Sequence, residues 1–332
     1  MTAIAAAHGA ARQIDRDAIP VIDIAPLAAG QEADVAAQML AAAETTGFFY
    51  VRNHGVPDAL IAQTFALGRQ FFSAPPAMKD QVAVNAWHRG FIRQGEATMY
   101  KGARPDMKES FIWGLHAADS ANGPNAHGIP PNQWPNFVPA MPTVLAAYFA
   151  AVHAVGWRLM RAFAAGLGVA PETFVRSIDH PTSRGSLVWY PPPADETMEA
   201  GKEQYGVSPH TDWGCLTLLC QDATGGLEVQ GRDGEWVTAH PIEGTYVVNV
   251  GDLLARWTND RFKSTPHRVV NRSGRERLSC AMFIDPNRDT PIVPVLRPGE
   301  VARYSAVSCG DYVQSRFDQA FAYRQKPTSD PC

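Results

Sequence analysis

The second half of the chain is a succession of short runs rich in β-branched and aromatic residues, separated by turn sequences. The runs are Leu187–Tyr190, Leu216–Cys220, Leu227–Gln230, Trp236–Ala239, Thr245–Val250, His267–Asn271 and Leu278–Ile284. Glycine pairs or Asx/Ser-Gly steps at Gly225-Gly226, Asp233-Gly234 and Ser273-Gly274 mark turns between them. Runs of this length and spacing are typical of antiparallel barrels and jelly rolls. We therefore predict an all-β core.

The first half has a different pattern, in which helical periodicity dominates. We expect a short strand at Ile19–Ile24, a strand starting at Gly47, and helices at Ala33–Thr45, Pro57–Phe72 and Thr143–Leu167. The stretch Ala121–Trp134 is rich in Gly, Pro and Asn, which suits either a lid or a plain surface loop. A last helix is expected at Cys309–Tyr323. The fold class is thus mainly β with N-terminal helices.

These patterns divide the chain into regions without a composition break that would separate independent domains. We expect a flexible tail at residues 1–17, a mixed α/β region at 18–180 packed on the core, a β core at 181–300, and a C-terminal helix and tail at 301–332. Together they are predicted to form one structural unit.

Composition limits the class of partner. The chain has 332 residues, 19% charged residues and a formal net charge of −4, so it lacks the basic excess that nucleic acid or an anionic membrane would require. A small-molecule substrate is the default. Five cysteines without a CxxC pair suit reduced thiols in a cytoplasm, and no export signal or uninterrupted apolar span is predicted. The oligomeric state is left open.

Two histidines and one aspartate form a candidate metal site. His210 and Asp212 are i and i+2, so in an extended segment their side chains share a face. A jelly roll can bring His267, on a later predicted strand, beside them. Two imidazoles and one carboxylate leave adjacent coordination positions open, as an iron(II) centre that binds a chelating co-substrate and O2 requires. A His-x-Asp pair alone is more often a turn or a helix cap.

A second group follows on the next predicted strand. Arg277 and Ser279 are again i and i+2, so a guanidinium and a hydroxyl could together bind a buried carboxylate. Tyr190, which precedes a proline run, could donate a third hydrogen bond. With the metal group, this pattern favours 2-oxoglutarate, which has a chelating 2-oxo acid and a distal carboxylate. The simpler alternatives are an ion pair of Arg277 on the sheet surface and packing of Tyr190 on the prolines.

Several motifs in a fixed order identify a family. They are Ile19-Pro-Val-Ile-Asp23, Gly47-Phe-Phe-Tyr-Val-Arg-Asn-His-Gly55, Arg89-Gly-Phe91, Asp106-Met-Lys-Glu-Ser-Phe111, Trp189-Tyr-Pro-Pro192, His210-Thr-Asp-Trp-Gly-Cys-Leu-Thr217, Gly225-Gly-Leu-Glu-Val229, Val248-Asn-Val-Gly-Asp252, Ser264-Thr-Pro-His-Arg-Val-Val270 and Arg277-x-Ser279. With these motifs in this order, the chain resembles the isopenicillin N synthase-like branch of the iron(II)- and 2-oxoglutarate-dependent dioxygenases. The resemblance extends from Ile19 to about Tyr323.

The resemblance implies a double-stranded β-helix core, a cupin-like jelly roll. It matches His210, Asp212 and His267 to the iron ligands, Arg277 and Ser279 to the carboxylate-binding pair, and Tyr190 to the tyrosine that usually assists them. The expected reaction uses iron(II), 2-oxoglutarate and O2, oxidises a small molecule, most often by hydroxylation, and releases succinate and CO2. Two residues before Tyr190 the chain has Val188, where family members often have Asn or, in isopenicillin N synthase, Arg. That departure disfavours isopenicillin N synthase itself.

Two other functions remain open from the sequence. One is an oxidase of the same fold that needs no 2-oxoglutarate and uses Arg277 and Ser279 to hold its own substrate's carboxylate. The other is a zinc hydrolase or non-catalytic metal-binding jelly roll. By their position beside motifs, Phe91, Arg93, Trp213 and Phe283 are predicted to form the substrate wall. Arg89 and Arg93 could pair with an acidic substrate, although surface arginines are the commoner case.

Overall fold

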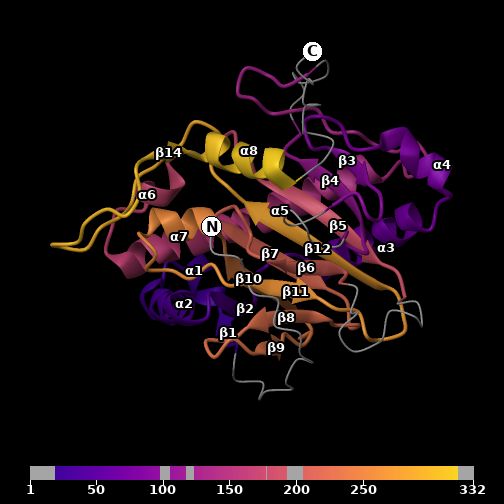
Figure 1. Ribbon diagram of the computed structural model, residues 1–332. Helices are drawn as coiled ribbons and strands as arrows, with labels where there is room; N and C mark the ends of the chain where they lie inside the picture. Colours follow the sequence, from indigo (N-terminus) through magenta and orange to yellow (C-terminus); the bar gives the residue numbers. More distant parts are fainter. Residues whose placement is uncertain (1–18, 98–104, 117–122, 177, 193–204, 321–332) are drawn as a thin grey trace, which may run out of the picture.

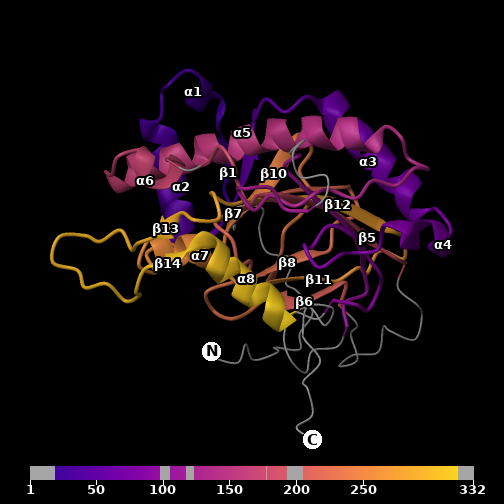
Figure 2. The same cartoon turned by 90° about the horizontal axis from the view of Figure 1, so that it is seen from above.

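Two β-sheets face each other, and helices cover the outer side of the larger sheet (Figures 1 and 2). The computed structural model describes residues 19–97, 105–116, 123–176, 178–192 and 205–320. The tail predicted at 1–17 lies outside these residues, as do the start of the stretch Ala121–Trp134 and the end of the predicted C-terminal helix.

The larger sheet combines strands from both halves of the chain. It has 8 strands in the order β1-β2-β10-β7-β12-β5-β4-β3. Their bounds are β1 Val21–Asp23, β2 Phe48–Arg52, β3 Gly90–Ile92, β4 Glu109–Gly114, β5 Arg184–Tyr190, β7 Leu216–Gln221, β10 Thr245–Val250 and β12 Arg277–Ile284. Strands β1 and β2 pair in parallel, with helix α2 (Ala33–Thr45) between them in the chain. The predicted strand–helix–strand opening is therefore present, and β2 joins it to the core through antiparallel pairing with β10.

The smaller sheet closes the core. It has 4 strands in the order β6-β11-β8-β9, with bounds β6 Val207–His210, β8 Leu227–Gln230, β9 Trp236–Thr238 and β11 His267–Val269. Apolar side chains from both sheets fill the space between them, among them Tyr190, Val207, Val229, Val247 and Val269. Sheets packed face to face over such an interior form the jelly roll that the strand pattern predicts. A short pair, β13 (Pro291–Ile292) and β14 (Val307–Ser308), lies apart.

Strands β3 and β4 were not predicted from the sequence. Both extend the larger sheet beyond β5, and β4 pairs with β5 along its whole length, from Glu109 opposite Trp189 to Gly114 opposite Arg184. The polar residues Lys108, Glu109 and Ser110 hide the strand signal of the aromatic residues that follow. A partner strand supplied by the core decides the conformation here, because strand propensity depends strongly on tertiary context.

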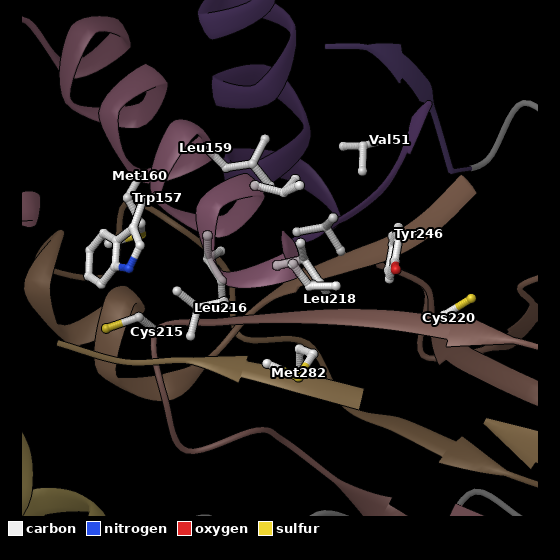
Figure 3. Packing of buried hydrophobic residues seen from close by; sticks show 14 of the residues in the cluster. Val51, Trp157, Leu159, Met160, Cys215, Leu216, Leu218, Cys220, Tyr246 and Met282 are labelled. Atoms are coloured by element: carbon white, nitrogen blue, oxygen red, sulfur yellow. The ribbon is translucent and has the colours of Figure 1, made fainter. Parts of the chain in front are cut away.

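Helix α5 (Met141–Leu167) is the central helix of the outer layer, flanked by α2 and α3 (Asp58–Phe72). By length and hydropathy it could cross a membrane, yet half of its most apolar window is buried inside the protein. Its buried face meets Leu216, Leu218 and Met282 of the larger sheet, opposite Leu159 and Met160 (Figure 3). These contacts make α5 a core helix. The helices predicted at 57–72 and 143–167 correspond closely to α3 and α5.

Shorter helices connect or cap these elements. They are α1 Ala25–Ala28, α4 Pro76–Lys79, the 3₁₀ turn η2 Asp80–Val82, α6 Glu172–Val175, α7 Asp252–Trp257 and α8 Cys309–Ala320. Helix α8 is the predicted C-terminal helix. Figure 2 shows it beside α7, in agreement with the 3.7 Å ion pair between Arg316 of α8 and Asp252 of α7.

Gly156 lets helix α5 pack closely against the larger sheet, and a substitution at this position tests that packing. A Cβ at position 156 would lie 2.6 Å from Cγ1 of Ile284 on β12. We expect Gly156→Ala to lower the free energy of unfolding by about 1–2 kcal/mol, because overpacking outweighs the gain in helix propensity of about 1 kcal/mol. Urea denaturation of the single variants and of Gly156→Ala with Ile284→Ala, which lacks all three contacting atoms, measures the effect. The second substitution should reduce the cost of the first; a Gly156→Ala protein at least as stable as the parent would contradict this packing.

Candidate metal centre and substrate pocket

His210, Asp212 and His267 come together at one end of the smaller sheet. His210 is the last residue of β6 and His267 the first of β11, and the two residues are directly opposite in the antiparallel pair. Their ring centroids are 4.3 Å apart. One potential ligand atom from each of the three residues lies within 4.8 Å of the others. Strand pairing therefore delivers both imidazoles to one point.

Backbone carbonyls fix the orientation of both imidazoles. Nδ1 of His210 lies 2.8 Å from the carbonyl oxygen of Ser208, and Nδ1 of His267 lies 3.2 Å from that of Thr265. A proton on each Nδ1 can be donated to these carbonyls, which leaves Nε2 with a free lone pair. Both Nε2 atoms lie 3.7 Å from Oδ1 of Asp212. Two nitrogens and one oxygen thus converge.

The orientation of Asp212 is set by the larger sheet. Its Oδ2 accepts hydrogen bonds from Oγ1 of Thr217 at 2.5 Å and from Nδ2 of Asn249 at 2.7 Å. Thr217 on β7 and Asn249 on β10 are paired across those strands. We expected His210 and Asp212 to share a face of one strand. Asp212 instead lies beyond the end of β6, so another contact brings the two side chains together. The two donors occupy Oδ2 and leave Oδ1 facing the imidazoles.

The protonation states suit cation binding. Burial, together with the neighbouring His267, lowers the pKa of His210 to about 3, so its ring is neutral near pH 7. Burial alone would raise the pKa of Asp212, but His267, His210 and the hydrogen bonds from Asn249 and Thr217 lower it on balance. The neutral imidazole of His210 and the ionised carboxylate of Asp212 are donor forms that a divalent metal needs. The group contains no thiolate, which fits iron better than a structural zinc site.

Arg277 forms a second polar centre inside the core. Its side chain is fully buried at the start of β12. Its guanidinium donates to the carbonyl of Gly225 at 2.6 Å, to Oγ of Ser279 at 3.1 Å and to Oε1 of Gln221 at 3.2 Å. Arg277 and Ser279 thus share a face, as their spacing predicted. The alternative of a surface ion pair is wrong, because the guanidinium is inside.

Tyr190 lies opposite Arg277 in the pairing of β5 with β12. The guanidinium carbon of Arg277 is 4.6 Å from the centre of the tyrosine ring, a cation–π contact. Tyr190 is buried, so its ring covers one side of the arginine. Val188, opposite Ser279 in the same pairing, contributes an apolar wall beside this polar centre.

A pocket of about 120 Å³ opens beside the histidine–aspartate group. Its lining is His88, Ile92, Ala97, Lys108, Ser110, Ile112, Arg184, Ser186, Val188, His210, Thr211, Asp212, Trp213, Phe283 and Phe317. The guanidinium of Arg184 lies between two aromatic rings, 4.3 Å from the centre of Phe283 and 4.8 Å from that of Phe317. Its Nη1 also lies 3.4 Å from Oδ2 of the buried Asp285. The pocket thus offers aromatic surfaces beside a few polar groups, as small-molecule sites do.

Two of the four predicted wall residues line this pocket. Trp213 and Phe283 do, whereas the predictions for Phe91 and Arg93 are wrong. Phe91 packs in the core against Phe71, and Arg93 forms exposed ion pairs with Asp80 and Glu96. Both lie on or just after β3, whose pairing with β4 the sequence did not reveal.

Sequence reasoning missed the polar residues contributed by β4 and β5. Lys108 and Ser110 alternate along the motif that runs to Phe111, and Arg184 and Ser186 alternate on the neighbouring strand. This spacing of two residues could have indicated from the sequence that each pair lies on one face of a strand. Phe317 could not have been found this way, because α8 reaches the pocket only through tertiary packing.

Known proteins share both parts of this architecture. Residues 19–137 match the family described as non-haem dioxygenase in morphine synthesis N-terminal, and residues 179–286 match the 2OG-Fe(II) oxygenase superfamily. A homoarginine-6-hydroxylase of Oryza sativa subsp. japonica is 34% identical over 90% of this chain and 96% of its own length. The chain belongs to the iron(II)- and 2-oxoglutarate-dependent dioxygenase superfamily.

Other relatives agree with this assignment. Validamycin A dioxygenase of Streptomyces hygroscopicus subsp. limoneus is 33% identical over 89% of this chain and 84% of its own length. A full-length Neurospora crassa protein, crystallised with alpha-KG and thymine, superposes with a TM-score of 0.81, at 30% identity over 91% of this chain and 98% of that one. The dioxygenase is thus an enzyme that uses iron(II), 2-oxoglutarate and O2 to oxidise a small molecule, releasing succinate and CO2.

The two hydrogen bonds to Asp212 generate a prediction for the dioxygenase. Thr217→Val removes the donor 2.5 Å from Oδ2 while keeping the side-chain shape. We expect the affinity for iron(II) to fall by about 10–100-fold, because the carboxylate loses part of its orientation. Anaerobic titration with iron(II) measures this loss. Thr245→Val, on the same strand as Asn249, is the matched control, since its hydroxyl donates to the carbonyl of Ile242, away from the metal centre; equal affinities in the two variants would refute the role given to Thr217.

Proposed function

We propose that His210, Asp212 and His267 are the iron(II) ligands of this dioxygenase. The proposal rests on the convergence of one ligand atom from each of the three side chains. Every other polar atom of these side chains already has a hydrogen-bond partner. Each Nδ1 faces a backbone carbonyl, and Oδ2 of Asp212 holds two hydrogen bonds. The atoms left over are the two Nε2 nitrogens and Oδ1, which face one another. Such a set supplies two nitrogens and one oxygen on one side of a metal and leaves the other side open.

We further propose that Arg277 and Ser279 bind the distal carboxylate of 2-oxoglutarate, with Tyr190 beside them. A fully buried guanidinium requires an anion, and in the described part of the chain no carboxylate lies within ion-pair distance of Arg277. The hydrogen bonds of Arg277 to Gly225 and Gln221 fix the orientation of its guanidinium. A carboxylate would therefore bind to N–H donors that are already in position. The ring of Tyr190 covers one side of the guanidinium and so excludes water from the pair.

With both groups bound, iron(II) and 2-oxoglutarate supply the oxidising power by activating O2. The chain's own residues then decide what is oxidised. We propose that the substrate binds in the pocket of about 120 Å³ and contacts Trp213, Phe283 and Phe317, with its polar atoms near Lys108, Ser110 and Ser186. Relatives named hydroxylases favour hydroxylation as the outcome.

The experiment that tests the co-substrate site uses anaerobic enzyme reconstituted with iron(II) and 2-oxoglutarate. Chelation by the 2-oxo acid should produce a weak visible charge-transfer band. We expect Arg277→Gln to raise the dissociation constant of 2-oxoglutarate about tenfold or more, because a charged hydrogen-bond pair is lost. Arg69→Gln, at an exposed arginine of α3, is the control. An unchanged titration in Arg277→Gln would remove Arg277 from the site.

Succinate release separates this reaction from that of an oxidase that needs no 2-oxoglutarate. In a screen of small-molecule substrates we expect succinate to form in a one-to-one ratio with the oxidised product. Product formed without 2-oxoglutarate and without succinate would assign Arg277 and Ser279 to the substrate's own carboxylate instead.

A further inference from the structure

A second cavity, of about 360 Å³, lies next to the pocket beside the metal centre. The two hollows share His88, Arg184 and Phe317 as lining residues. The second cavity is lined in addition by Arg89 of the segment before β3, by Ile129, by Arg288, and by Val313 of α8. No aspartate or glutamate lines it among the residues that the structure describes. It is therefore a cavity lined by basic and apolar side chains.

Arg89 is the unusual residue of this cavity. Its side chain is only 6% exposed, and its Nε is buried with no hydrogen-bond partner among the described residues. Its Nη1 donates to the carbonyl of the neighbouring residue, His88, at 3.1 Å. Gly114 makes room for the guanidinium, since a Cβ there would lie 2.3 Å from Nη2 of Arg89. The expectation of a surface arginine is wrong for Arg89.

The buried cations of the described chain fall into two groups. Lys79, Arg184 and Arg268 each have a carboxylate partner: Glu109, Asp285 and Glu228 respectively. Arg277 and Arg89 have none within ion-pair distance in the described residues. For Arg277 the missing anion is the proposed co-substrate. Because a buried, unpaired charge is costly, the same argument calls for an anion at Arg89.

The surroundings narrow the kind of anion. Burial, and in second place the charge of Arg184, lower the pKa of Arg89 to about 9, so it remains charged near pH 7. Arg184 is already balanced by Asp285, and Arg288 is exposed. One buried guanidinium with a free Nε suits a planar, singly charged carboxylate better than a doubly charged phosphate. Trp87, Ile129, Val313 and Phe317 offer apolar contacts to the rest of such a molecule.

We propose that this cavity binds a small organic carboxylate, with Arg89 as its principal partner, and that it does so independently of iron and of Arg277. The carboxylate belongs either to the far end of the primary substrate or to a separate molecule. In both cases Arg89 would bind the carboxylate in the same way. Because the cavity shares lining residues with the pocket beside the metal centre, a long substrate could reach both, and a separate molecule could bind in the cavity alone.

Benzoate tests the site, with benzamide as a neutral molecule of the same shape. Calorimetric titration of the metal-free full-length enzyme in a low-chloride buffer should show benzoate binding at least about tenfold tighter than benzamide. Arg89→Gln should abolish that difference, whereas Arg277→Gln and Arg69→Gln should leave it unchanged. Benzoate binding that is lost in Arg277→Gln, or no preference for benzoate over benzamide, would overturn the proposal while leaving the co-substrate site untouched.

A second variant guards against misfolding of Arg89→Gln, which circular dichroism and thermal unfolding would reveal. Arg288→Gln changes an exposed residue of the same cavity and should weaken benzoate binding about two- to threefold at low salt. Benzoate binding in Arg288→Gln equal to that in Arg69→Gln would count against the cavity as the binding place.

Steady-state kinetics with a substrate from the succinate screen distinguish the two sources. If the carboxylate is the substrate's own, benzoate competes with it, and Arg89→Gln raises KM with little change in kcat. If it belongs to a separate molecule, benzoate does not compete and KM is unchanged in Arg89→Gln. Either result supports the site, provided that benzoate binding itself depends on Arg89.

Discussion

The proposed metal centre depends on the two hydrogen bonds that Thr217 and Asn249 donate to Oδ2 of Asp212. The imidazoles belong to the smaller sheet, and these two donors belong to the larger one. Asp212 lies in the connection between them. Closing the sandwich therefore assembles the site, because only then does the carboxylate face both Nε2 atoms. Rigid strands give such a constellation the precision that loops alone would not.

The space between the sheets provides a site in which the charged carboxylate of the proposed co-substrate would lie inside an apolar core. Arg277 is fully buried against Tyr190, which belongs to the apolar cluster that also contains Val188 and Val207. In a medium of low polarity a charge-assisted hydrogen bond is stronger than at the surface, and an unpaired charge is costly. The same cost of an unpaired buried charge applies to Arg89, in the cavity that Phe317 also lines. Buried cations without carboxylate partners thus mark places where the protein is complete only with an anion.

The first part of the chain shapes the substrate pocket as well as covering the core. Strands β3 and β4 widen the larger sheet. Ser110 of β4 and Lys108, just before that strand, line the pocket. From the other end of the chain, Phe317 of α8 contacts His88 and Trp213. Residues far apart in the sequence therefore line the pocket, while the proposed metal ligands come from the β core. This division fits a superfamily in which one chemistry is applied to different substrates.

Local patterns and motifs were enough to predict the chemistry of this protein and the type of its core. The length and spacing of short β-rich runs predicted the jelly roll. The i, i+2 spacing placed Arg277 beside Ser279, because a side-chain period of two is a local property of an extended backbone. Tertiary structure alone decided how Asp212 turns toward His267, that Phe91 and Arg93 lie outside the pocket, and that Arg89 is buried. These outcomes depend on which strands pair and which helix end covers them. Long-range pairing is set by the packing of the whole core, which no local pattern encodes.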